Sequence, residues 1–311
     1  MGFELHLGKD CLGIGKAIKA LSEFTGTLIE PKLIVARAKA QKKACELLND
    51  KTTDTSNLPT PLKAEDLSIE ERAEITQKHR NVVKQENMET ITGYACQELL
   101  GDSDVSPEPL DEYWATQFFN RASDVSSEQM QEIWGKILAG EIKRPNTYSL
   151  RTLEILSNMT ADEAERFAKV SNYVFTYKDA GFVLASESLL DKYEIFFFDF
   201  MVLEECGLIK AIRVTLTPEF SDGNIDKFHY GNLSLVLKRS NDNRLYHLPT
   251  YPLTQAGLQI YNLFLQQPNK EFFIDALHDL KYSGLVHPSI AGLEISGEEH
   301  QKEDEISPLK N

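Results

Sequence analysis

Apolar residues recur at helical spacing around positions 130–138 of the chain. They follow one another at intervals of three and four residues and therefore form one stripe of an amphipathic helix: Met130, Ile133, Trp134, Ile137 and Leu138. The phrase Ser126-x-x-Gln129 before it is a capping-box signature, and Thr160-x-x-Glu163 repeats this signature before a further helical run. Because each of these helices has a single apolar face, the pattern predicts that they pack together in a helical bundle over residues 65–180.

Two helical runs precede this region. Residues 1–48 place apolar side chains such as Ile14 and Ile18 at helical spacing, and Pro31 separates the first run from the second. Residues 49–64 combine Thr, Ser and Asn with two prolines, which is typical of a linker. We therefore predict that residues 1–48 form basic N-terminal helices separate from the bundle.

The periodicity changes after residue 180. A helix rich in phenylalanine precedes the strand-like segments AIRVTLT and NLSLVLKRS, and the Leu-Thr-x-Ala-Gly phrase at 253–257 opens a closing helix. A recognition-type helix, a β-ribbon and a closing helix in this order are the elements of a winged helix. We predict a winged-helix-like α+β module at 181–295 and an acidic disordered tail at 296–311. The predicted fold is therefore mainly α with a smaller α+β part.

The chain is acidic, but its charge is unevenly distributed. Its 311 residues include 33 lysines and arginines against 48 aspartates and glutamates, which gives a formal net charge of −15. Residues 9–48 hold eight basic and four acidic side chains, a local charge of +4, so the remainder carries −19. A field of that sign repels polyphosphates, which excludes a general nucleic-acid coat.

The sequence predicts a soluble protein of a reducing compartment. No apolar run approaches the roughly 18–20 residues that span a bilayer, and the N-terminal residues lack the pattern of a secretory signal. The cysteines, Cys11, Cys45, Cys96 and Cys206, stand far apart, which argues against a disulfide framework and against a zinc knuckle. We expect a cytoplasmic location.

Motifs for catalysis do not emerge from the sequence. Residues 13–16 (GIGK) have the wrong spacing for a P-loop, and Ala17 stands where the hydroxyl that holds magnesium belongs. The histidines never pair at metal-ligand spacing, and Asp275 with His278 is best explained as a surface ion pair. We expect a non-enzymatic protein without cofactor or metal. A cryptic metal-dependent nuclease built from scattered carboxylates is the second alternative.

Basic residues provide the candidate contacts to a partner. They lie in the N-terminal runs and in the predicted wing, and they are candidates for nucleic-acid or protein contact: Arg37, Lys39, Lys42, Lys43, Lys238, Arg239 and Arg244. A cationic amphipathic helix can lie on anionic lipid, touch nucleic acid, or pack its apolar stripe into a partner subunit. No aromatic belt accompanies the N-terminal runs beyond Phe24, which favours a homo-oligomer or a protein partner over peripheral membrane contact.

The predicted winged helix can contact either protein or DNA. Residues 184–267 hold ten acidic side chains against seven basic ones, a local charge of −3, without the basic footprint of a DNA reader. The candidate recognition helix is dominated by Phe196, Phe197, Phe198 and Phe200, which suit packing better than contact with base edges. We therefore favour protein contact, and a DNA-associated winged-helix regulator is the first alternative.

Glu141 is the residue that the pattern leaves unexplained. It falls outside the apolar stripe and near the C-terminal end of its helix, where a carboxylate opposes the helix dipole. The nearest positive charges that could offset this unfavourable position are those of Lys143 and Arg144. Trp134, by contrast, belongs to the stripe, and we expect it to pack in the core.

The central sequence resembles a bacterial domain family of unknown function. The resemblance rests on the phrase Gln-x-x-Trp-x-x-x-Leu-Ala-Gly-Glu at 131–141, on an upstream Arg/Lys-Gln-Glu-Asn-Met phrase and on two later turns, and it covers about residues 75–265. One departure is Asn146, where the family is expected to have Gly. The helical core is also similar to proteins implicated in abortive infection, which implies a phage-defence context but no catalytic residues. We therefore expect a non-enzymatic interaction or assembly protein in bacterial anti-phage defence of the abortive-infection type.

Overall fold

The computed structural model describes residues 67–99, 105–220, 225–238, 247–264, 268–282 and 292–295. The predicted N-terminal helices, the linker and the acidic tail lie outside the described residues. Contacts between residues divide the chain into two compact units, with the boundary between Asn158 and Met159. They are called the first and the second unit.

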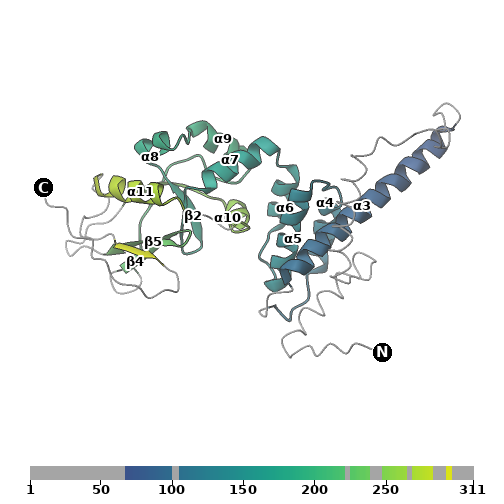
Figure 1. The fold of residues 1–311 in the computed structure, drawn as a ribbon, viewed down its shortest axis with the longest axis horizontal. Helices are drawn as coiled ribbons and strands as arrows, with labels where there is room; N and C mark the ends of the chain where they lie inside the picture. Colours follow the sequence, from purple (N-terminus) through teal and green to yellow (C-terminus); the bar gives the residue numbers. More distant parts are fainter. Residues whose placement is uncertain are drawn as a thin grey trace, which may run out of the picture. The chain divides into compact units, whose positions relative to one another are not determined.

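The first unit is helical. It contains α3 (Ile69–Leu99), α4 (Glu112–Ala122), α5 (Glu128–Lys143) and α6 (Leu150–Asn158). Helix α3 runs beside α5, and α4 lies against α6 (Figure 1). The stripe predicted on α5 faces the interior, since the side chains of Trp134, Ile137 and Leu138 are fully buried. Trp134 therefore packs in the core, as the pattern predicts, with its ring centroid 5.2 Å from that of Phe118.

One of the two predicted capping boxes forms, at the start of α7 (Ala161–Ser171). The Thr160 hydroxyl accepts a hydrogen bond from the Glu163 N–H (3.3 Å), and the Glu163 carboxylate accepts one from the Thr160 N–H (2.7 Å). The box predicted at Ser126 is wrong, because α5 begins one residue later with Ser127 as its N-cap, and the Ser127 side chain makes no capping hydrogen bond. The third helical position is then Met130, which carries no oxygen to complete a box.

The second unit combines helices with strands. Its helices are α7, α8 (Glu187–Lys192), α9 (Phe197–Glu205), α10 (Gln255–Tyr261) and α11 (Lys270–Tyr282). Its strands are β1 (Val174–Tyr177), β2 (Ala180–Leu184), β3 (Val214–Leu216), β4 (Ile225–Tyr230), β5 (Leu233–Lys238), β6 (Leu248–Pro252) and β7 (Gly292–Ile295). Within the described residues, these strands form one antiparallel sheet in the order β3-β6-β2-β1-β4-β5-β7.

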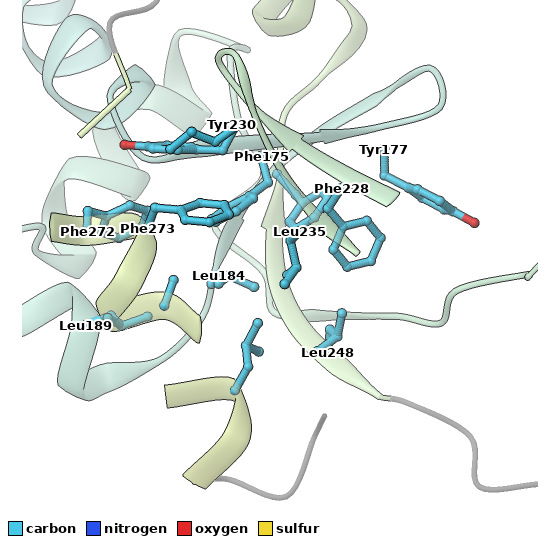
Figure 2. Packing of buried hydrophobic residues seen from close by; sticks show 14 of the residues in the cluster. Phe175, Tyr177, Leu184, Leu189, Phe228, Tyr230, Leu235, Leu248, Phe272 and Phe273 are labelled. Carbon is cyan, nitrogen blue, oxygen red and sulfur yellow. The ribbon is translucent and has the colours of Figure 1, made fainter. Parts of the chain in front are cut away.

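One face of the sheet carries a large aromatic core. Phe175 of β1 and Phe228 of β4 point to this face, where Phe272 and Phe273 of α11 pack against the sheet (Figure 2). Leu189 of α8 joins the same cluster. Because successive side chains of a strand point to opposite faces, the residues between these positions point to the other side of the sheet, where Lys227 and His229 of β4 are exposed.

Helices α9 and α10 cover this opposite face at β2 and β6. Gly181 of β2 faces α10, since an added Cβ there would lie 3.0 Å from the side chain of Leu258. Phe200 of α9 stacks on Tyr251 of β6, with ring centroids 4.3 Å apart. The sheet is therefore covered on both faces at β2 and β6, and α9 contacts it through the buried ring of Phe200.

The Leu-Thr-x-Ala-Gly phrase seats α10 against the turn that follows α9. The Thr254 hydroxyl donates a hydrogen bond to the Gly207 carbonyl (2.6 Å) and accepts one from the Gly257 N–H (3.0 Å). A Cβ at Gly257 would lie 1.9 Å from the carbonyl oxygen of Leu208. Only glycine permits this close approach, which gives the phrase a structural reason.

The chain is thus a mixed α/β protein, and its division differs from the predicted one. Helix α7, expected in a bundle over 65–180, belongs to the second unit and packs against α9. Residues 174–177, expected in the same bundle, form β1, because its hairpin with β2 places Phe175 in the core of the sheet. The segments AIRVTLT and NLSLVLKRS contain the strands β3 and β5, but these do not pair with each other: β3 pairs with β6, and β5 pairs with β4 and β7. The ribbon of the predicted winged helix is therefore not confirmed.

Candidate protein-interaction surface

Three phenylalanines and a methionine are exposed side by side at the start of α9. The exposed fractions are 56% for Phe196, 55% for Phe197, 60% for Phe198 and 45% for Met201. Phe200 belongs to the same short sequence but is fully buried, because it points toward the sheet. Phe196, Phe197, Phe198 and Met201 are called the phenylalanine surface. Adjacent exposed apolar side chains mark interaction sites, whereas single ones do not.

Cations from α7 lie over two of the rings. The guanidinium carbon of Arg166 is 5.3 Å from the ring centroid of Phe198, and the ammonium nitrogen of Lys169 is 5.3 Å from that of Phe196. Arg166 and Lys169 are three residues apart on α7, so they face α9 together. Each cation over an exposed ring contributes about 0.5–1 kcal/mol. These contacts orient the rings while leaving more than half of each accessible to water.

Buried Asp199 ties the two cations to α9. One of its carboxylate oxygens accepts a hydrogen bond from the Arg166 guanidinium (2.8 Å). The other accepts hydrogen bonds from the Lys169 ammonium (3.2 Å) and from the Phe196 N–H at the start of the helix (3.0 Å). Burial raises the pKa of Asp199, but the hydrogen bonds outweigh burial and hold this pKa below its ordinary value. Asp199 is therefore an ionised anchor beneath the phenylalanine surface.

Both cations make a further contact. The Nε atom of Arg166 lies 2.8 Å from the Asp162 carboxylate, four residues earlier on α7. The ammonium of Lys169 donates a hydrogen bond to the main-chain carbonyl of Glu194 (2.5 Å). The exposed rings thus stand on a network that connects α7, the segment before α9 and α9 itself. Such preorganisation reduces the side-chain entropy that would be lost if a partner bound to these rings.

Exposed carboxylates lie on the same elements as the phenylalanine surface and its two cations. They lie on α7, before α9 and at the end of α9: Asp162, Glu165, Glu194 and Glu205. With Asp199 they are five carboxylates against the two cations Arg166 and Lys169, which gives these seven residues together a formal charge of −3. Because both cations already bind carboxylates, the charge that this surface presents outward is negative.

The seven basic residues predicted as contacts stay a prediction. Lys238 is the last residue of β5. Six others lie outside the described residues: Arg37, Lys39, Lys42, Lys43, Arg239 and Arg244. Sequence reasoning missed Arg166, Lys169 and Asp199, because they come together only when α7 packs against α9. The available signal was an aspartate at the third position of a helix, where it can reach back to the first backbone N–H groups.

Glu141 is a buried carboxylate that holds the turn between α5 and α6. Its two oxygens accept hydrogen bonds from the backbone N–H groups of Asn146 (2.7 Å) and Tyr148 (2.8 Å). Asn146 has a φ of 69°, the left-handed backbone conformation that favours the glycine expected there. Burial raises the pKa of Glu141, and the backbone hydrogen bonds partly oppose this rise. These donors offset the unfavourable position of a carboxylate at a helix end.

Further features of the described residues concern possible metal ligands, a hollow on the first unit and helix length. No group of three His, Cys, Asp or Glu side chains among these residues is arranged to hold a metal ion. A hollow along α3 is lined by one face of that single helix, including Glu74, Lys78 and Val82, so polar groups do not converge on it. None of the helices described is both long and apolar enough to cross a membrane.

The fold and the surface define a two-unit α/β protein with a group of exposed aromatic side chains on its second unit. The chain belongs to the family described as protein of unknown function (DUF2806), whose model matches residues 71–278. This match begins within α3 and ends within α11, so it includes the phenylalanine surface. No curated protein and no solved structure matches the chain.

Proposed function

We propose that this protein is a non-enzymatic interaction protein that assembles with another polypeptide through the phenylalanine surface. The observation that supports this is the exposure of three adjacent rings on a network of buried and charged contacts. The centres of protein interfaces are enriched in aromatic residues, methionine and arginine, with a polar rim around them. The phenylalanine surface has both the aromatic residues and the rim.

The four side chains of the phenylalanine surface are large enough to contribute several kcal/mol to the free energy of binding a partner. Fully burying a Phe or Met side chain contributes about 1.5–3 kcal/mol. The four side chains are each about half exposed, so covering them contributes about 3–6 kcal/mol in total. A micromolar complex requires about 8 kcal/mol. The surface can therefore act as the centre of an interface, while the acidic rim selects the partner.

The test of this proposal is the mass of the native particle. The full chain is purified at its natural expression level and its mass is measured by light scattering, beside a variant that carries Phe197→Ser and Phe198→Ser. We expect the wild-type chain in a particle larger than a monomer, and the variant as a monomer. The matched control is Ile274→Ser on α11, which removes an equally exposed apolar side chain (50%) from another helix and should leave the particle intact. A monomeric wild type, or a variant particle of unchanged mass, contradicts the proposal.

We also propose that this assembly serves bacterial anti-phage defence of the abortive-infection type. Its support is the resemblance of the helical core to abortive-infection proteins. Phage plating on bacteria with and without the gene tests it directly. We expect the gene to lower plating efficiency and the Phe197→Ser, Phe198→Ser variant to lose this protection. Equal plating with and without the gene, across a panel of phages, contradicts the defence role.

A DNA-associated winged-helix regulator is the alternative function. Its support is the β4–β5 hairpin, which ends at Lys238 and is followed in the sequence by Arg239 and Arg244. If this hairpin binds DNA, affinity falls steeply with salt, and replacing the three side chains by alanine flattens that dependence. Absent or salt-independent binding removes this alternative.

A further inference from the structure

The outward face of α9 changes from apolar to acidic along the helix. Phe197, Met201 and Glu205 follow one another at intervals of four residues, so they lie along one face of α9. Phe198 adjoins this row, three residues before Met201. All four side chains are exposed. A molecule lying along α9 therefore meets aromatic rings at the first turn and a carboxylate at the last.

Glu205 is a carboxylate without a paired cation. Among the residues that the structure describes, no lysine or arginine forms an ion pair with it, and the last turn of α9 holds no basic residue. The C-terminal end of a helix carries a partial negative charge, to which Glu205 adds its own. The start of α9 differs, because Arg166 and Lys169 already lie over its rings. A cation from another molecule is therefore favoured at the end of α9.

A second copy of the phenylalanine surface does not supply this cation. Helix α9 (FFDFMVLEE) contains no lysine, arginine or histidine. Antiparallel pairing of two α9 helices would place Glu205 of one copy on the exposed rings of the other, and parallel pairing would bring the two Glu205 side chains together. An anionic membrane is disfavoured for a similar reason, because its surface potential is negative.

We infer that the occupant of the phenylalanine surface is an amphipathic helix of a partner protein, with two apolar residues one turn apart and a lysine or arginine two turns from the first. From Phe197 to Glu205, α9 rises about 12 Å, which positions i to i+8 of a partner helix also span. A helix satisfies its own backbone hydrogen bonds, whereas an extended segment would bury N–H and C=O groups against rings that cannot pair with them. This inference rests on the proposed function, since it takes the surface as a polypeptide-binding site.

Two synthetic peptides test the inference on the full chain, produced in a foreign host. Both are helices about 14 residues long, stapled on the far face, with leucine at positions i and i+4. One has lysine at i+8 and the other has glutamate. The methyl signal of Met201 reports binding by NMR, in a chain labelled with carbon-13 at its methionine methyl groups.

The expected result is a preference for the lysine peptide. Covering side chains that are each about half exposed supports a dissociation constant of about 1 mM, so each peptide is titrated to several times that concentration. We expect the lysine peptide to shift the Met201 signal and to bind about tenfold more tightly than the glutamate peptide, because glutamate replaces attraction to Glu205 by repulsion.

A charge reversal and its matched control make the result specific. Glu205→Lys should invert the preference, and this variant should fold, because a lysine at a helix C-terminus complements the dipole. Glu112→Lys reverses an exposed carboxylate on α4 and should leave the preference as in the wild type. The signal of Met130 on α5 should not shift. No shift of the Met201 signal, equal affinities of the two peptides for the wild type, or an unchanged preference in Glu205→Lys overturns the inference.

Other occupants are tested with the same NMR signal. A stapled peptide with the sequence of α9 represents a second copy, and vesicles of phosphatidylcholine with phosphatidylserine represent a membrane. We expect neither to shift the Met201 signal. A shift with either one that equals or exceeds the shift with the lysine peptide overturns the inference.

Failure of the inference can be told apart from failure of the proposed function. If Phe197→Ser and Phe198→Ser dissolve the native particle but the wild type does not distinguish the two peptides, the surface binds a partner of different chemistry and the inference alone is wrong. If the peptides bind as expected but the particle mass is unchanged by these substitutions, the surface accepts a basic helix and the proposed function is wrong.

Discussion

Replacing Asp199 by alanine removes the buried carboxylate that binds Arg166 and Lys169 beneath the phenylalanine surface. Loss of one partner from a buried ion pair costs about 3–5 kcal/mol, because the other charge is left without compensation. The remaining cations are partly solvated here, since the Arg166 and Lys169 side chains are 28% and 38% exposed. The Phe196 N–H also loses its acceptor at the start of α9. We therefore expect Asp199→Ala to lower the free energy of unfolding by about 2–3 kcal/mol.

Urea unfolding followed by circular dichroism measures this loss. Asp162→Ala is the matched control, because it removes a different carboxylate from the same Arg166, but one whose side chain is 68% exposed. An exposed ion pair contributes about 0–1 kcal/mol. Both tryptophans, Trp114 and Trp134, lie in the first unit, so their fluorescence shows whether that unit is affected. A loss for Asp199→Ala no larger than that for Asp162→Ala would refute the reasoning.

The pH dependence of this effect has a defined sign. The folded-state pKa of Asp199 lies below its ordinary value, which is about 3.9 in an unfolded chain. Its stabilising contribution is therefore fully present above the unfolded-state pKa and is lost as the pH falls through the folded-state pKa. We expect wild type and Asp199→Ala to differ by the full amount near neutral pH and to converge as the pH drops below about 4.

Three further substitutions and one control substitution test the account of the fold by thermal or urea unfolding. Gly257→Ala should cost about 2–3 kcal/mol, because its Cβ would meet the Leu208 carbonyl at 1.9 Å; a neutral effect would mean that α10 can move away at no cost. Thr160→Ala should cost about 1 kcal/mol by loss of the cap, whereas Ser126→Ala should change little, and equal losses would contradict the capping assignment. Glu141→Ala should cost about 2–3 kcal/mol, since two backbone N–H groups lose their acceptor, and a loss below about 0.5 kcal/mol would show that the turn does not depend on it.

Local pattern was sufficient to predict some elements from the sequence. The stripe that contains Trp134 is periodic over two turns and lies in the buried face of α5. The box at Thr160 forms because its two members are neighbours in the sequence and need no other part of the fold. The box at Ser126 failed by one residue, since the pattern alone does not fix where a helix begins. The resemblance to a family of unknown function was confirmed by the family match, which says nothing of phage defence.

Long-range packing decided what the sequence could not predict. Phe196, Phe197, Phe198 and Phe200 look alike in the sequence, yet only Phe200 is buried, because it stacks on Tyr251, which lies far along the chain. The strands β1 and β2 are short, so their segment gave no clear alternation, and their place depends on pairing with β4 and β6. Whether a segment forms a helix can thus be predicted from neighbouring residues. Which face of α9 is exposed, by contrast, depends on how α9 packs in the second unit.

Hydroxyl-radical footprinting of the native particle tests most directly whether the phenylalanine surface is an occupied contact. The oxidation rate of Phe197 and Phe198 is compared with that of Tyr113, an aromatic side chain of the first unit that is 65% exposed. We predict that the two phenylalanines are oxidised severalfold more slowly, after correction for intrinsic reactivity, than their exposed fractions in the isolated fold would give. Oxidation at the rate of a fully accessible ring in the native particle would contradict the account.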